Sequence, residues 1–265
     1  TFASNFIMLG VQTWRLETSP LDVIGTTFGT TWLIRMIITI IIIGLWFWME
    51  KKNEITIKGQ IPLLIASLIL IATTTMMGHG ASTELEAPWI LDYSHNLLSS
   101  IWIGGVIFFA FVALPTITKT ENSIKEKITL SLIPRFSGLF IIAIGILIIT
   151  GPTLLWFLDD NVASLTDSTY GKLILIKIGI AAVMIAFGGL YQVKFMRDTY
   201  DFEKLDISKK IGKPLKIEAG LGIALLAVVA LLVNSSLPAG EIQSADALQG
   251  TFGYESVLFS ENAKF

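Results

Sequence analysis

The sequence predicts an all-α fold, a polytopic transmembrane helix bundle with six complete spans plus a partial N-terminal helix. Hydrophobic residues make up 53% of the 265 residues, charged residues only 15%, and the mean hydropathy is +0.70. A soluble domain of this size needs far less apolar surface to fill its core. The apolar residues also fall into continuous runs of about 20, the length that a helix needs to cross a bilayer. These runs are too long for the strands of a membrane barrel, so helices are expected.

Each span is expected where a long apolar run is bounded by polar residues. The six runs are Thr30 to Trp48, Ile61 to Met77, Leu97 to Leu114, Phe136 to Phe157, Leu173 to Val193 and Leu215 to Val233. The opening stretch TFASNFIMLGVQ is apolar but too short to span, and we interpret it as the second half of a further helix with more helices upstream. Residues 1–234 therefore form one predicted membrane domain, and residues 235–265 form a tail.

The charged residues of the loops predict an orientation. Lys and Arg gather in the loops near residues 51–58, 119–127 and 194–213, whereas acidic residues dominate near residues 17–22, 84–92 and 159–167. Because basic loops stay on the cytoplasmic side, we expect a multi-pass protein of the cell membrane whose acidic loops and C-terminal tail are extracytoplasmic. The basic residues are accounted for by topology, so no nucleic-acid partner is expected.

Four ionisable residues fall inside the predicted spans, where such groups are costly and often functional. Arg35 and Lys177 are both expected in the outer half of the membrane. Arg135 and Glu218 each follow an inner loop and enter the membrane at the cytoplasmic face. They could form a structural ion pair between two helices. The alternative is that each side chain reaches the inner surface by itself.

The candidate metal ligands lie at the predicted outer boundary. The chain has no cysteine and two histidines, so a soft metal ligand must be Met or His. His79 ends one predicted outer helix and His95 begins the next, which brings the two imidazoles within reach of each other. Met76 precedes His79 by three residues on the same helical face, and Met77 is offset by about 100°. Imidazole and thioether ligands suit copper, although a capping histidine and packed methionines would give the same pattern.

Three residues beside this candidate site are interpreted as packing. Gly104 and Gly105 would let neighbouring helices approach closely, as small residues do in membrane bundles. Trp102 is two turns below His95 on the same face, and we interpret it as a packed side chain in preference to a gate. The sequence contains no Ser/His/Asp set, phosphate loop or HExxH motif, so an enzyme is not expected.

Several short segments, in this order, resemble the copper resistance protein D (CopD) family. They are TTFGTTWLIR at residues 26–35, Gly78 with His79, HNLLSSIWIGG at residues 95–105, PRFSG at residues 134–138, YGKLILIK at residues 170–177, and Glu218 near the start of the last span. The resemblance implies an inner-membrane protein that moves copper, with His79 and His95 as preferred ligands. It also implies a periplasmic CopC-like copper-binding domain or protein as a partner.

The expected function is therefore copper transport or homeostasis, with copper taken at the outer face through His79 and His95 and passed across the membrane. Two other functions stay open. Both imidazoles could instead ligate a non-covalent haem whose propionates bind Arg35 and Lys177. The chain could also be an accessory subunit of a larger membrane complex, in which its histidines are structural.

Overall fold

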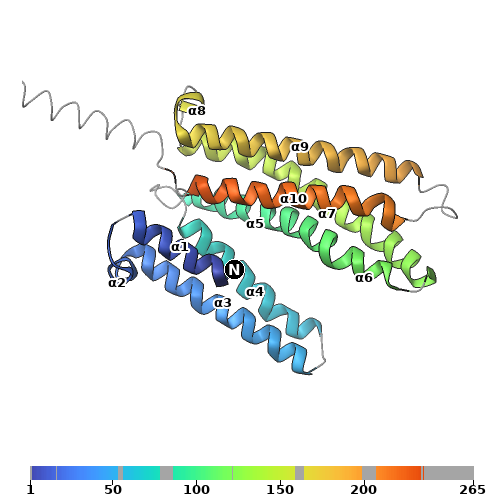
Figure 1. Ribbon diagram of the computed structural model, residues 1–265, viewed down its shortest axis with the longest axis horizontal. Helices are drawn as coiled ribbons and strands as arrows, with labels where there is room; N and C mark the ends of the chain where they lie inside the picture. Colours follow the sequence, from blue (N-terminus) through green and yellow to red (C-terminus); the bar gives the residue numbers. More distant parts are fainter. Residues whose placement is uncertain are drawn as a thin grey trace, which may run out of the picture. The chain divides into compact units, whose positions relative to one another are not determined.

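The computed structural model describes residues 2–15, 17–52, 56–77, 86–120, 122–158, 164–198, 207–233 and 235, and all its regular elements there are helices (Figure 1). They are α1 (Phe2–Arg15), α2 (Pro20–Ile24), α3 (Thr27–Lys52), α4 (Ile57–Met76), α5 (Glu86–Phe108), the π-helix η2 (Phe109–Ala113), α6 (Leu114–Thr118), α7 (Asn122–Leu158), α8 (Ser164–Asp167), α9 (Thr169–Asp198) and α10 (Ile207–Val233).

The predicted fold class is confirmed. Six helical segments within the described residues are long and apolar enough to cross a membrane: Thr27–Lys52, Ile57–Met76, Ala87–Thr118, Pro134–Phe157, Thr169–Leu190 and Gly212–Val233. Each contains one of the six predicted runs or most of it. The N-terminal partial helix is also present as α1, whose 14 residues extend about 21 Å and cannot cross a hydrocarbon core of about 30 Å. Apart from Ser235, the predicted tail lies outside the described residues.

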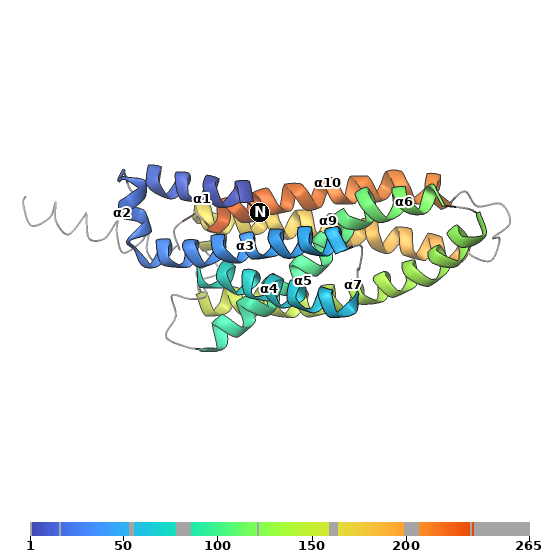
Figure 2. The same cartoon turned by 90° about the horizontal axis from the view of Figure 1, so that it is seen from below.

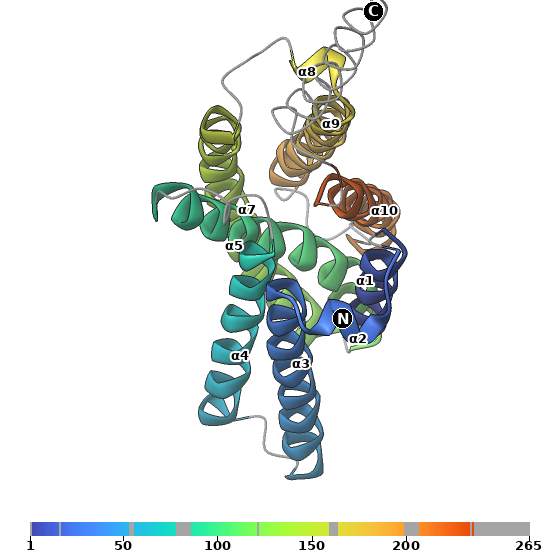
Figure 3. The same ribbon diagram turned by 90° about the vertical axis from the view of Figure 1, so that its left-hand side faces the viewer.

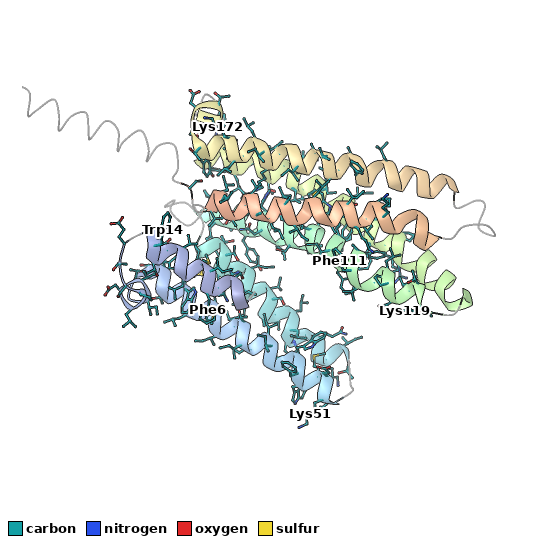
Figure 4. All side chains as sticks on the ribbon, in the orientation of Figure 1. Phe6, Trp14, Lys51, Phe111, Lys119 and Lys172 are labelled. Carbon is teal, nitrogen blue, oxygen red and sulfur yellow. The ribbon has the colours of Figure 1, made fainter. Side chains whose placement is uncertain are left out.

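The chain divides into two units, and the boundary between them falls between Leu98 and Ser99, inside α5. In the first unit, α3 and α4 run side by side and α1 packs on α2 and α3 (Figures 2 and 3). Trp14 lies near the C-terminal end of α1 and Lys51 at that of α3 (Figure 4). Gly29 is where α3 crosses α2, and a Cβ there would overlap the backbone of Val23 and Ile24.

The second unit is built on the long contact between α9 and α10 (Figure 1). Its core contains the buried residues Trp102, Ile103, Val106, Ala110, Met184, Ala219 and Leu225. Lys119, after α6, and Lys172, in α9, lie at opposite ends of this unit (Figure 4).

The third span contains a π-helical segment that the sequence analysis did not predict. In η2 the N–H of Leu114 donates to the carbonyl of Phe109, five residues earlier. Pro115 follows directly, and a proline has no N–H and crowds the carbonyl four residues before it, which favours a wider turn here. Phe109 and Ala110 of this segment are buried, and the ring of Phe109 packs edge-on against Phe136 of α7 at 5.2 Å.

Candidate functional site

His95, one of the two predicted imidazole ligands, lies inside α5 and not at its start. The sequence placed the beginning of this span at Leu97, but α5 begins at Glu86, so the residue is about 13 Å into the helix at 1.5 Å per residue. The earlier start is explained by Pro88, which is fully buried in the first turn, where its missing N–H needs no partner. His95 itself is half-buried.

Hydrogen bonds of the residues next to His95 join α5 to α4. The amide nitrogen of Asn96 donates to the hydroxyl of Thr75 on α4 at 3.2 Å and to the carboxylate of Asp92 at 3.0 Å. Thr75 is completely buried, so the Asn96 amide has a fixed acceptor. Tyr93 donates from its hydroxyl to the carbonyl of Leu68 on α4 at 3.4 Å, which is a second link between the two helices. The carboxylate of Asp92 is thus held one helical turn before His95.

The other predicted ligands lie around the end of α4. Met76 is the last residue of α4 and its side chain is 52% exposed, whereas Met77 is the C-cap, with its N–H donating to the carbonyls of Thr74 and Thr75. His79 lies outside the described residues, so its pairing with His95 stays a prediction. No group of three or more His, Cys, Asp or Glu that could hold a metal is found in the described ranges.

Arg35 is the centre of a polar cluster that ties α1, α3 and α4 together. Its Nε donates to Asn5 Oδ1 at 2.8 Å, and its Nη1 donates to the hydroxyls of Thr73 at 3.1 Å and Thr74 at 2.7 Å. Nη1 also lies 3.4 Å from the carbonyl of Leu70. Across the described chain, none of the hydrogen-bond partners of Arg35 carries a charge. The guanidinium is therefore solvated by neutral oxygens, and none of these partners neutralises its charge.

Asn5 fixes α1 to this cluster from the other side. Asn5 is 0% exposed, and its side-chain amide nitrogen donates to Thr39 Oγ1 at 3.2 Å. Its backbone carbonyl accepts from the indole nitrogen of Trp32 at 2.8 Å. The rings of Phe6 and Trp32 meet edge-on at 6.3 Å. Every buried side-chain nitrogen and oxygen in the described part of the chain has a partner, as buried polar groups in a membrane require.

The remaining intramembrane ionisable residues lie in the second unit. Lys177 is half-buried on α9. Arg135, on α7, is exposed, while the carboxylate of Glu218 on α10 faces Gly188 of α9, at which a Cβ would lie 3.3 Å from Oε1. Within the described ranges no ion pair joins Arg135 to Glu218, because the glutamate side chain is directed at the glycine surface of α9.

Two of the three expected packing residues have that role. Trp102 is 4% exposed in the core of the second unit. The ring of Phe140 on α7 lies 2.6 Å from where a Cβ of Gly105 would be, so α5 and α7 approach closely there. Nothing lies within 4 Å of the corresponding position at Gly104, which is exposed.

An exposed carboxylate, Asp22, lies on the short helix α2. Ser19 is the N-cap of α2, and its hydroxyl accepts from the Asp22 backbone N–H while it also donates to the Asp22 carboxylate at 2.6 Å. The hydroxyl of Thr18 donates to the same oxygen at 3.1 Å. These hydrogen bonds, that of Ser19 above all, hold the pKa of Asp22 below its ordinary value of 3.8.

Two family models match this chain. That of the copper resistance protein D-like N-terminal domain matches residues 5–88, and that of copper resistance protein D matches residues 130–232. Together the two segments cover more than half of the chain, and they include Arg35 and its partners, Lys177 and Glu218.

Two curated proteins are similar over most of the chain. The copper transport protein CutJ of Bacillus subtilis (strain 168) is 26% identical over 216 residues, which cover 80% of this chain and 37% of CutJ. Copper resistance protein D of Pseudomonas syringae pv. tomato is 26% identical over 245 residues, which cover 85% of this chain and 74% of that protein. No solved structure matches. The all-α fold and the six apolar helices are those of a multi-pass membrane protein. Together with the two family matches, they show that the chain belongs to the copper resistance protein D family.

Proposed function

We propose that this protein transports copper across the cell membrane, taking the ion at the extracytoplasmic face through His79 and His95. The observation that carries the proposal is the family membership, because both similar proteins are named for copper transport or copper resistance. The position of His95 supports it, since this imidazole is half-buried on α5, in the part of the helix that the charged loops place toward the outer face.

The chemistry of the expected outer side favours capture of a cation. Acidic residues in the loops near residues 84–92 and 159–167 raise the local concentration of copper ions. Imidazole nitrogens bind copper in both common oxidation states, and Met76 and Met77 add soft thioether ligands as weaker candidates. A CopC-like copper-binding domain or protein on that side would deliver the ion.

Copper uptake into liposomes and the copper content of the purified protein test this function. The chain has only two histidines, so a His79→Ala, His95→Ala double variant removes every imidazole. We expect this variant to lose copper binding and uptake, whereas the matched Met76→Leu variant keeps most of both. Copper binding and uptake that are unchanged in the double variant would contradict the proposal.

The same preparation distinguishes the other two functions. A haem protein would show a Soret absorption band that the double variant lacks, and Arg35 has the charge and the intramembrane position to bind a propionate. An accessory subunit would be isolated with other chains in mild detergent and would not transport copper alone. A colourless single chain that accumulates copper in liposomes agrees with transport only.

The proposed orientation is tested separately. The chain has no native cysteine, so single cysteines introduced at Glu17, Lys51, Lys119 and Asp167 report their own exposure. We expect a membrane-impermeant maleimide to label the first and last positions in intact cells, and the other two only after the membrane is opened. Labelling of positions 51 and 119 in intact cells would reverse the orientation.

A further inference from the structure

We propose that Glu218 binds and releases a proton, and that copper transport is an exchange in which this proton leaves as copper passes. This inference rests on the proposed function, because it names the ion that moves against copper. The chemistry is one proton transfer. The carboxylate takes a proton from water to form the neutral acid, and release returns that proton to water with no other bond changed.

Glu218 lies inside the last span, among apolar side chains. The span begins at Gly212, so Glu218 is six residues, or about 9 Å, into it. Its side chain is half-buried, and the next residue, Ala219, is completely buried in the core of the second unit. Leu215 and Leu221, three residues before and after Glu218, pack against the same core. An ionisable group at such a place is costly, and such groups often belong to ion or proton pathways.

A glycine of α9 makes room for this carboxyl group. A Cβ at Gly188 would lie 3.3 Å from Glu218 Oε1 and 3.9 Å from Oε2, so both oxygens are close to this glycine. Four residues further along α10, a Cβ at Gly222 would lie 3.5 Å from the methyl group of Met184, which also belongs to α9. The carboxyl group therefore lies at the interface of α9 and α10, the two helices that run side by side in Figure 1.

The described residues around Glu218 offer no cation to pair with it. Besides α9, α10 packs mainly on η2 and α6, and neither contains an ionisable residue; nor do residues 99–108 of α5. On α9 up to Leu190, the nearest charged residue is Lys177, eleven residues or about 16 Å before Gly188. On α10, Lys216 is exposed and lies on the opposite side of the helix, about 200° from Glu218.

The other described ionisable residues of the second unit are exposed, except a tyrosine at the far end of α9. They are Lys119, Arg135, Asp167, Tyr170, Lys172 and Lys213. Glu218 is thus the ionisable group that the described part of this unit holds among apolar residues without a charged partner.

A single carboxyl group with such neighbours suits a proton and not a metal ion. A copper site needs several ligands, and no group of three or more His, Cys, Asp or Glu lies within the described ranges. The residues that pack beside Glu218 are leucine, alanine and glycine, whose side chains hold no ligand atom. A carboxyl oxygen binds a proton by itself. A cation that enters this unit stabilises the charged carboxylate and so favours release of the proton, which couples the two ions.

Copper uptake into liposomes with a pH difference tests the exchange. With Cu(I) kept reduced, exchange of one ion for one proton moves no net charge, so an acidic lumen should raise copper accumulation up to about tenfold per pH unit. Copper entry should also raise the luminal pH, which enclosed pyranine reports. We expect Glu218→Gln to accumulate the same copper with and without the pH difference. Glu218→Asp keeps the carboxyl group and should restore the response.

Two neighbouring glycines of α9 give a matched pair of variants. Gly188→Ala places a methyl group 3.3 Å from Glu218 Oε1, closer than an ordinary contact, and should weaken the response to pH. Nothing lies within 4 Å of the Cβ position at Gly189, so Gly189→Ala should behave like the wild type. Every variant should bind as much copper in detergent as the wild type, which shows that it is folded.

The outcomes separate this inference from the proposed function. If the wild type accumulates copper but the pH difference has no effect, or if Glu218→Gln responds to it as the wild type does, the exchange is wrong and copper transport stands. If Glu218→Gln does not fold, an equal response of Gly188→Ala and Gly189→Ala overturns the inference. If the wild type accumulates no copper under any condition, the proposed function is wrong and the exchange with it.

Discussion

Replacing Asn5 by alanine should detach α1 from the first unit. The substitution removes two side-chain hydrogen bonds, one from Arg35 Nε at 2.8 Å and one to Thr39 at 3.2 Å. A hydrogen bond to a charged group contributes about 1.5–3 kcal/mol. A neutral bond between membrane helices contributes about 0.6 kcal/mol. We therefore expect Asn5→Ala to lower the free energy of unfolding by about 2–3.5 kcal/mol, the sum of these contributions.

The assay is an SDS titration of the protein in alkyl maltoside micelles. A single cysteine at the buried position Ala66 reports unfolding of α4 through its rate of reaction with a maleimide. Ile7→Ala, also on α1, is the matched control, because Ile7 is 66% exposed and its truncation removes no polar contact. If Asn5→Ala and Ile7→Ala shift the transition equally, the polar cluster does not hold α1 in place.

Three further predictions follow from the packing and the hydrogen bonds. Gly29→Ala should strongly destabilise the first unit, because the added methyl overlaps the backbone of α2, and the yield of folded protein in detergent measures this. Trp102→Ala should lower the free energy of unfolding by about 3–5 kcal/mol, the usual result of emptying a buried Trp position, whereas Trp156→Ala, 70% exposed, should have little effect. Ser19→Ala should raise the pKa of Asp22 toward 3.8, which NMR of the carboxyl carbon measures. Since the folded-state pKa lies below the unfolded one, the stabilisation by Asp22 is complete above pH 3.8 and is lost as the pH falls through the folded-state value.

The fold was predictable because a segment that lies in the hydrocarbon of a bilayer must be apolar along its whole length, so hydropathy identifies it. All six spans and the helical nature of the first residues follow from apolar run length alone. The residues at which the helices begin and end were less predictable, since a helix continues past its apolar part until a helix-breaking residue or a cap ends it. α5 begins at Glu86 and α7 at Asn122, each more than ten residues before the apolar run, from Leu97 or from Phe136, that predicted the helix.

The polar clusters were harder to predict than the spans. Arg35 was identified from its charge, but its partners Asn5, Thr73 and Thr74 are neutral and gave no comparable signal. The run Thr73 to Thr75 inside an apolar span was the available indication, because three consecutive hydroxyls at a helix end can face two neighbouring helices. Asp92 and Asn96 have the spacing of residues one turn apart on a helix, which becomes visible only once α5 is known to extend back to Glu86.

The neutral surroundings of Arg35 have a consequence for any ion that enters the first unit. Hydroxyl and amide dipoles stabilise the guanidinium without cancelling its charge, so its electric field extends into the bilayer. With an effective dielectric constant of about 20, a monovalent cation at about 8 Å is disfavoured by about 2 kcal/mol, or roughly thirtyfold in occupancy. A divalent ion at the same place would meet twice that barrier. Cations are therefore disfavoured close to Arg35 and anions are attracted there, so the copper path of the proposed function must stay away from this polar cluster of α1, α3 and α4.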